Sequence, residues 1–155
     1  YGLPLSAVAH GIFYNIDVFK QLDLEIPQTW EDLLDTAQTL KDSGILPFAN
    51  SMGNAAFDLD DRLFTALVAN FTGDREGRLA YERGDRCFND EGVVATFEAI
   101  AELQPYLDPT DRPLFESIDR FIEGEAAMFI ENRVGRPRFQ AIAESGRNDA
   151  PPRVG

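Results

Sequence analysis

The chain contains few of the residues that metal sites and nucleophilic active sites require. Its 155 residues include one cysteine, Cys87, and one histidine, His10. A single cysteine cannot form a disulfide within the chain, and a structural zinc site uses about four Cys or His ligands. His10 lies in an apolar stretch without a nucleophile signature such as Gly-x-Ser-x-Gly. We therefore expect no metal, no cofactor and no Cys-His or Ser-His catalysis.

Positive charge is also scarce. The chain has 14 Lys and Arg against 27 Asp and Glu, which gives a net charge of -13, and its only lysines are Lys20 and Lys41. Nucleic acids and anionic membranes are bound by clustered cations. This composition argues against both as partners and leaves small neutral or cationic ligands open.

Long apolar runs are missing as well. No stretch reaches the roughly 20 apolar residues of a membrane span, and none has the basic-then-apolar pattern of a secretory leader. The chain opens at Tyr1, without an initiator Met, in residues typical of a strand, so we expect a segment upstream of it. Its length and hydrophobic content fit one domain with its own core.

Helical patterns alternate with short apolar runs of strand length. The clearest helix start is at Thr29, a capping residue followed by Trp30, Glu31 and Asp32, and Trp30 is expected to anchor this helix against the domain. Gly44 ends the helix before a short buried strand in residues 45–49. Further helices are expected within residues 15–22, 59–73, 89–105, 114–124 and 139–146, the third of them capped at Asn89-Asp90. Further strands are expected within 1–6, 8–14 and 126–130, and irregular structure in the polar stretch 73–85. The pattern predicts a helix-rich α/β fold.

Polar and aromatic residues follow two of the predicted strands. In open α/β sheets, ligands bind beyond the carboxyl ends of the strands. Amides, a guanidinium group and an aromatic ring are the groups that bind the hydroxyls and the apolar face of a sugar. His10 is interpreted as a structural or pocket-lining residue. The predicted ligand-binding residues are Asn50, Ser51, Asn54, Phe57, Asn132, Arg133 and His10.

An alternative interpretation of these residues stays open. Asn50, Ser51 and Asn54 also suit turns and caps, and Phe57 also suits a core position. The many carboxylates of the chain offer pairs for acid/base catalysis, but nearly all fall at predicted helix starts or on polar faces, where capping and solvation explain them.

Five short motifs occur in a fixed order over most of the chain. They are Tyr1-Gly2-Leu3-Pro4, then residues 13–19 (FYNIDVF), 27–33 (PQTWEDL), 44–48 (GILPF) and 121–130 (FIEGEAAMFI). In this order they resemble the family 1 extracellular solute-binding proteins, relatives of maltose-binding protein. No single motif is specific, whereas the ordered set is.

The resemblance implies two α/β lobes of the type II periplasmic-binding-protein fold, which close on a ligand and deliver it to a membrane permease. It covers only the second lobe, so residues 1–155 are expected to be a C-terminal-lobe segment without the first lobe and the C-terminal return segments. The implied protein is not an enzyme. It is the solute-binding subunit of an ABC importer for a sugar or polyol, on the periplasmic or extracellular face of the cytoplasmic membrane.

The chain departs from the family pattern at two cleft positions. Relatives often carry Gly-x-Trp after the last motif, where this chain has Asn132-Arg133-Val134, and the acid of maltose binders falls at Val8. A maltose-like ligand is therefore not expected, and Arg133 favours an acidic or phosphorylated solute. Two alternatives remain open: a sensory lobe that presents its ligand to a receptor, and a carboxylate-based hydrolase.

Overall fold

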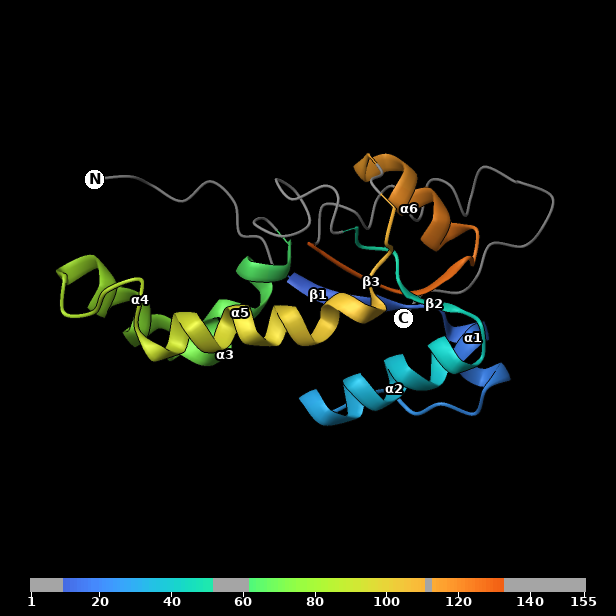
Figure 1. Ribbon diagram of the computed structural model, residues 1–155, viewed down its shortest axis with the longest axis horizontal. Coiled ribbons are helices and arrows are strands. Elements are labelled where there is room, and N and C mark those ends of the chain that lie inside the picture. Colours follow the sequence, from blue (N-terminus) through green and yellow to red (C-terminus); the bar gives the residue numbers. More distant parts are fainter. Residues whose placement is uncertain (1–9, 52–61, 111–112, 133–155) are drawn as a thin grey trace.

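Within the part of the chain that the structure describes, a three-stranded mixed sheet lies at the centre. A computed structural model describes residues 10–51, 62–110 and 113–132. Strand β3 (Ala126–Asn132) is the middle strand, with β1 (His10–Tyr14) antiparallel on one side and β2 (Leu46–Phe48) parallel on the other (Figure 1). The register places His10 opposite Asn132, and Phe48 opposite Met128.

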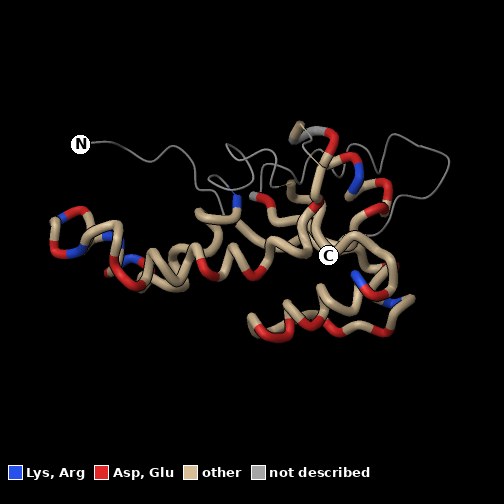
Figure 2. The backbone as a smooth tube through the Cα atoms, viewed as in Figure 1, with Lys and Arg blue, Asp and Glu red and all other residues tan. Residues whose placement is uncertain are grey.

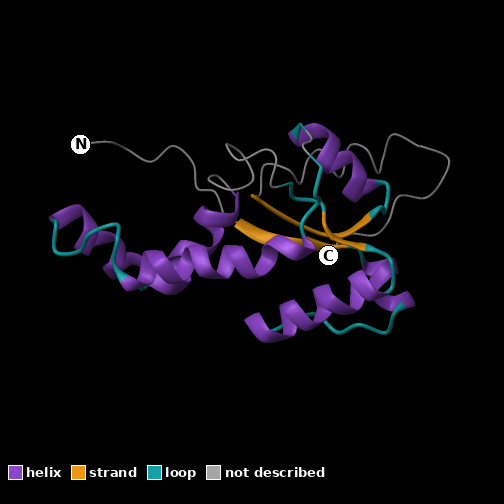
Figure 3. Ribbon diagram, viewed as in Figure 1, coloured by secondary structure: helices purple, strands orange, loops and turns teal. Residues whose placement is uncertain are grey.

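Helices cover both faces of this sheet. Helix α6 (Leu114–Ile122) lies over one face, and α1 (Ile16–Gln21) and α2 (Trp30–Asp42) lie on the other (Figures 1 and 3). Strand β3 contributes to two cores, since Met128 and Ile130 pack in a large cluster with α1, α2 and α5, whereas Phe129 packs against α6. The helix-rich α/β fold expected from the sequence is confirmed.

The start of α2 forms as its sequence predicts. The Thr29 hydroxyl accepts a hydrogen bond from the Asp32 amide at 3.1 Å, and the Asp32 carboxylate accepts one from the Thr29 amide at 3.0 Å. This reciprocal capping box satisfies two amide groups that the helix itself leaves without partners. Gly44 follows the helix with a φ of 77°, a conformation that favours glycine. The chain then enters β2.

Three helices form an arm beside the sheet. They are α3 (Thr65–Thr72), α4 (Asp74–Arg83) and α5 (Glu91–Leu103), and the short 3-10 helix η2 (Gln104–Tyr106) follows α5 (Figure 1). Asp90 caps α5 by accepting a hydrogen bond from the Val93 amide at 3.1 Å, as its position in the sequence predicts.

The prediction that residues 73–85 are irregular is wrong, because α4 occupies most of this stretch. Its stability depends on contacts that an apolar periodicity does not reveal. The rings of Tyr81 and Phe88 stack at 5.2 Å between centroids. Gly77 packs so closely on α3 that a Cβ atom there would lie 1.8 Å from the Thr72 carbonyl oxygen. A polar helix is therefore held in place by aromatic stacking and close backbone packing.

Acidic positions outnumber basic ones along the described elements, and most basic positions lie near acidic ones (Figure 2). Two arginines with little exposed side chain form ion pairs: Arg62 pairs with Glu131, and Arg120 pairs with Asp108. None of the helices formed by the described residues combines the length and the apolar character needed to span a bilayer. Within the same residues, no three His, Cys, Asp or Glu side chains lie close enough together to hold a metal ion.

Candidate functional site

The carboxyl ends of β2 and β3 lie at the same edge of the sheet because the two strands are parallel. Asn50 and Ser51 follow β2 there, and Asn132 ends β3. Strand β1 begins at the same edge, because the antiparallel register pairs His10 with Asn132. The fold therefore brings together four predicted residues from three distant parts of the chain. The other three, Asn54, Phe57 and Arg133, lie outside the described residues.

The side chain of Asn50 is fully buried and bonded to the central strand. Its Nδ2 donates to the carbonyl oxygen of Ile130 at 2.9 Å, and its Oδ1 accepts from the Ile130 amide at 2.8 Å. The amide thus continues the pairing of β2 with β3 beyond the end of β2. This geometry gives Asn50 a structural role, and contact between Asn50 and a ligand stays a prediction.

Ser51 is also fully buried, and its hydroxyl donates to the carbonyl oxygen of Thr110. An isolated parallel bridge pairs Ser51 with Asp108. The turn after β2 is therefore held from two sides, by β3 through Asn50 and by residues 108–110 through Ser51.

His10 differs from these two residues because its Nε2 is buried without a hydrogen-bond partner. The residue as a whole is half-buried, at the start of β1. A buried ring nitrogen without a partner is costly unless water or a ligand completes its hydrogen bonding. Of the predicted residues whose side chains are described, His10 is the one with a buried polar atom that has no hydrogen-bond partner.

A buried ion pair lies beside these residues. Arg62 Nε donates to Glu131 Oε2 at 2.8 Å, and each side chain is only 4% exposed. Glu131 precedes Asn132 on β3, and Arg62 stands just before α3. The sequence indicated Glu131 only as a polar residue at the end of an apolar run, and it gave no signal for Arg62, because the pairing spans 69 positions.

A second buried carboxylate, that of Asp108, lies next to the turn after β2. Its Oδ1 accepts from the Thr110 amide at 2.9 Å and from the Thr110 hydroxyl at 2.6 Å, and its Oδ2 accepts from Arg120. Burial raises the pKa of Asp108, but the hydrogen bonds from Thr110 and Arg120 outweigh burial and hold this pKa below its ordinary value. Asp108 is therefore an ionised carboxylate at neutral pH.

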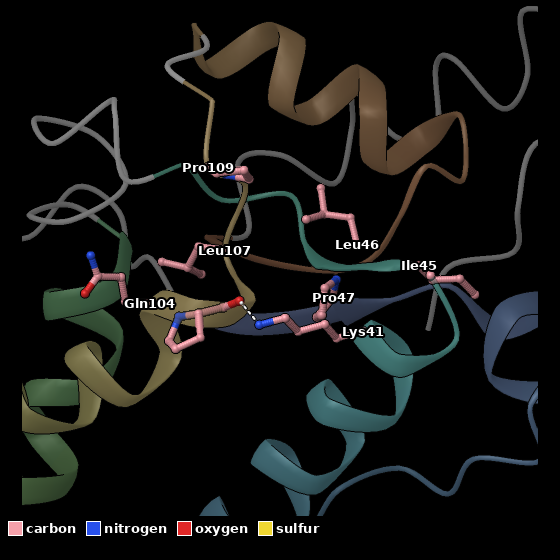
Figure 4. Close-up of a pocket in the computed structure, with 9 residues that line it drawn as sticks. Lys41, Ile45, Leu46, Pro47, Gln104, Leu107 and Pro109 are labelled. Atoms are coloured by element: carbon pink, nitrogen blue, oxygen red, sulfur yellow. Dashed lines mark hydrogen bonds between the residues drawn. The ribbon is translucent and has the colours of Figure 1, made fainter.

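The described residues also form an open cavity of about 610 Å³ between the end of α2, β2 and the segment after α5 (Figure 4). At its rim Lys41 Nζ donates to the Pro105 carbonyl oxygen at 3.0 Å. The lining is mostly apolar and contains none of the predicted site residues; it consists of Lys41, Gly44, Ile45, Leu46, Pro47, Gln104, Pro105, Leu107 and Pro109.

Comparison with known proteins finds relatives that bind solutes. The chain is 30% identical over 137 residues to YcjN of Escherichia coli strain K12, a protein assigned to the periplasmic-binding proteins of ABC transporters; the match covers 83% of this chain and 29% of that protein. A chitin oligosaccharide binding protein of known structure is 31% identical, with a TM-score of 0.78 over 90% of this chain and 36% of that one. RafE in complex with raffinose shares the fold at 19% identity, with a TM-score of 0.76 over 96% of this chain and 38% of that one.

The chain thus spans less than two fifths of the length of each of these relatives. The family model of the bacterial extracellular solute-binding proteins matches residues 1–132, which include every element described above. The chain belongs to the bacterial extracellular solute-binding protein family.

Proposed function

We propose that this chain is part of the solute-binding subunit of an ABC importer, which binds a sugar or related polyhydroxy solute and delivers it to a membrane permease. The observation that carries the proposal is the gathering of His10, Asn50, Ser51 and Asn132 at the carboxyl end of the sheet, in a chain of a solute-binding family. Ligands of open α/β sheets bind at this end. Such a subunit works outside the cytoplasm, on the periplasmic or extracellular face of the cytoplasmic membrane.

Residues 1–155 form, in this proposal, a segment of the C-terminal lobe of a two-lobed protein. The fraction of the relatives' length that the chain spans is in keeping with one lobe. Closure of two lobes gives the polar groups of a solute partners on both sides and removes them from water. The residues described above supply one wall of that cleft.

A sugar suits the chemistry of this wall. The Nε2 atom of His10 accepts or donates one hydrogen bond, depending on its protonation, and a sugar hydroxyl does both. Proteins of similar structure include one named as a chitin oligosaccharide binding protein and RafE, whose structure was solved in complex with raffinose. We therefore place oligosaccharides first among the candidate solutes, with acidic or phosphorylated sugars second because of Arg133.

The two buried carboxylates at this edge favour binding over hydrolysis. Glu131 is paired with Arg62, and Asp108 is paired with Arg120. A general acid has to hold its proton near neutral pH, whereas Asp108 has a lowered pKa. Both carboxylates serve to order the site.

A thermal-shift screen of the full-length parent protein tests this proposal. The compounds are chitin oligosaccharides, raffinose, stachyose, a polyol, a sugar acid and a sugar phosphate. A ligand present at 100 times its Kd stabilises the folded state by about 2.7 kcal/mol, and the melting temperature of the protein rises as a result. We expect a rise with at least one oligosaccharide. A parent protein whose melting temperature none of these compounds raises would contradict the proposal.

A pair of variants then locates the binding site. His10→Ala is expected to weaken binding of the active compound at least fivefold while changing the melting temperature of the free protein little. Lys20→Ala on α1 is the matched control and is expected to leave binding unchanged. Equal binding by the wild-type protein and His10→Ala would place the site elsewhere.

A further inference from the structure

The turn after β2, which contains Asn50 and Ser51, contacts residues 108–110, which lie far from it in the sequence. The Asp108 amide donates to the Asn50 carbonyl oxygen at 2.8 Å, and the bridge between Ser51 and Asp108 extends this contact. Residues 108–110 therefore form a backing layer for the turn that carries two of the predicted site residues.

The Asp108 side chain determines the shape of this backing layer. Its carboxylate accepts hydrogen bonds from both the amide and the hydroxyl of Thr110, which holds Thr110 against Asp108. The Thr110 carbonyl oxygen accepts the hydrogen bond from the Ser51 hydroxyl. Asp108, which is only 1% exposed, thus contacts the turn in two ways. Its backbone amide bonds to Asn50, and its carboxylate holds Thr110, which bonds to Ser51.

The cation that neutralises this carboxylate comes from α6. Arg120 Nη1 donates to Asp108 Oδ2, and Arg120 Nε donates to Glu125 Oε2 at 2.7 Å. The Glu125 amide also donates to the Arg120 carbonyl oxygen at 2.9 Å, directly before β3 begins. The guanidinium group of Arg120 therefore bridges Glu125, in the loop that enters β3, and Asp108, in the backing layer.

Helix α6 itself is firmly seated. Ile118 and Phe121 are buried, and the Phe121 ring packs on Phe129 of β3 with 6.0 Å between centroids. Arg120 therefore projects from a helix whose position relative to β3 is set by the core. A charge-assisted hydrogen bond from such a fixed donor is stronger and more directional than one between neutral groups.

We propose that Asp108 and Arg120 are positioning residues, which hold the Asn50–Ser51 turn against β3 and thereby set the solute affinity of the site. The part that concerns affinity rests on the proposed function. Neither residue needs to touch the solute, because both act through Asn50 and Ser51. A loss of the pair frees the turn to move away from the carboxyl end of β3.

The test compares Asp108→Asn with Asp90→Asn in the full-length protein. Asp90 is the matched control because it also pairs with an arginine, Arg86, and also accepts hydrogen bonds from backbone and hydroxyl groups, but it lies on the arm. Both variants are expected to lower the melting temperature. Hydrogen–deuterium exchange of the backbone amides in residues 46–51 and 108–110 is expected to speed up at least tenfold in Asp108→Asn only.

Affinity supplies the second measurement. For whichever oligosaccharide the thermal-shift screen identifies, Asp108→Asn is expected to raise the Kd at least fivefold, and Asp90→Asn is expected to leave it unchanged. If the wild-type protein binds none of the compounds, the proposed function fails, while the exchange measurement still decides whether Asp108 positions the turn. Unchanged exchange in residues 46–51 of Asp108→Asn would overturn the inference.

Variants of the arginine keep the test decisive if Asp108→Asn does not fold. Arg120→Met is expected to reproduce the faster exchange and the weaker binding. Arg120→Lys is expected to bring the exchange rate and the affinity part of the way back to the wild-type values, because it keeps the positive charge. Arg86→Met is the control on the arm. Equal exchange and equal affinity in Arg120→Met and Arg86→Met would show that the ion pair has only a general stabilising role.

Discussion

The side chain of Asn50 and the backbone of Ile130 form a reciprocal pair of hydrogen bonds, at 2.9 and 2.8 Å, 80 positions apart in the sequence. This pair mimics one rung of a β ladder just past the end of β2. It explains how a strand of three residues can hold its register beside β3.

Replacement of Asn50 should therefore reduce stability strongly. Asn50→Ala leaves the N–H and C=O groups of Ile130 buried without these partners, and each such group costs about 1–3 kcal/mol. We expect a loss of about 2–4 kcal/mol in the free energy of unfolding, measured by urea denaturation. Asn50→Asp is the near-isosteric comparison, because its carboxylate can accept from the Ile130 amide but repels the Ile130 carbonyl. A change below 1 kcal/mol in Asn50→Ala would show that water replaces the lost bonds.

The ion pair of Arg62 and Glu131 should behave differently when one partner or both are replaced. Removal of one partner of a buried pair leaves an uncompensated charge and costs about 3–5 kcal/mol. We expect a loss of this size for Arg62→Met, and recovery of most of it in Arg62→Met/Glu131→Leu, where no charge remains. A double-mutant cycle measured by urea denaturation checks the coupling between the two positions.

The exposed pair of Arg78 and Glu82, four residues apart on α4, is the control for that cycle. Its side chains are 66% and 54% exposed, so solvent screens their interaction and either single replacement should leave stability nearly unchanged. A double variant of the Arg62 pair that is as unstable as Arg62→Met alone would contradict the assignment of the loss to buried charge.

Local signals predicted much of the fold. The Thr29 cap, the Asp90 cap and the stop at Gly44 need only neighbouring residues, and all three are confirmed. The expected anchoring of α2 by Trp30 is confirmed too, because the half-buried ring packs against the large core and its Nε1 donates to Glu102 at 2.7 Å. Such elements are determined by patterns within a few residues.

Contacts between distant segments were not predictable in the same way. The extension of β3 to Asn132 depends on its antiparallel partner β1, whose register is not encoded near Asn132. The pairing of Arg62 with Glu131 and of Asp108 with Arg120 depends on how helices seat on the sheet. The sequence therefore predicted that the residues after β2 and β3 meet at one edge of the sheet, but it did not predict the ion pairs beside them.

Acid should weaken the contribution of Asp108 to stability. Its pKa is lower in the folded state than the ordinary value of 3.8, so the folded state binds the proton less readily than the unfolded chain does. The contribution is fully present above the ordinary value and is lost as the pH falls through the folded-state pKa. Arg120 is the cation that faces Asp108, and Glu125 faces Arg120 from the other side.

Urea denaturation at a series of pH values checks this sign. The difference in unfolding free energy between the wild-type protein and Asp108→Asn should be constant near neutral pH and should shrink in acid. A difference that grows as the pH falls below the ordinary pKa would mean that the folded state favours the protonated carboxyl group, and that Arg120 does not hold Asp108 ionised.

The isolated chain of 155 residues should bind solute far more weakly than the full-length protein does. Closure of two lobes is expected to supply partners on both sides of the solute, and a single lobe offers only half of them. Calorimetry with the oligosaccharide that the parent protein binds should give a Kd no tighter than about 1 mM for the isolated chain, which corresponds to about -4 kcal/mol. A circular-dichroism melt of the same sample provides the control, because a cooperative transition shows that the chain is folded when binding is measured. Micromolar binding by the folded chain would mean that the complete site lies within these residues, and that enclosure between two lobes is not the source of its affinity.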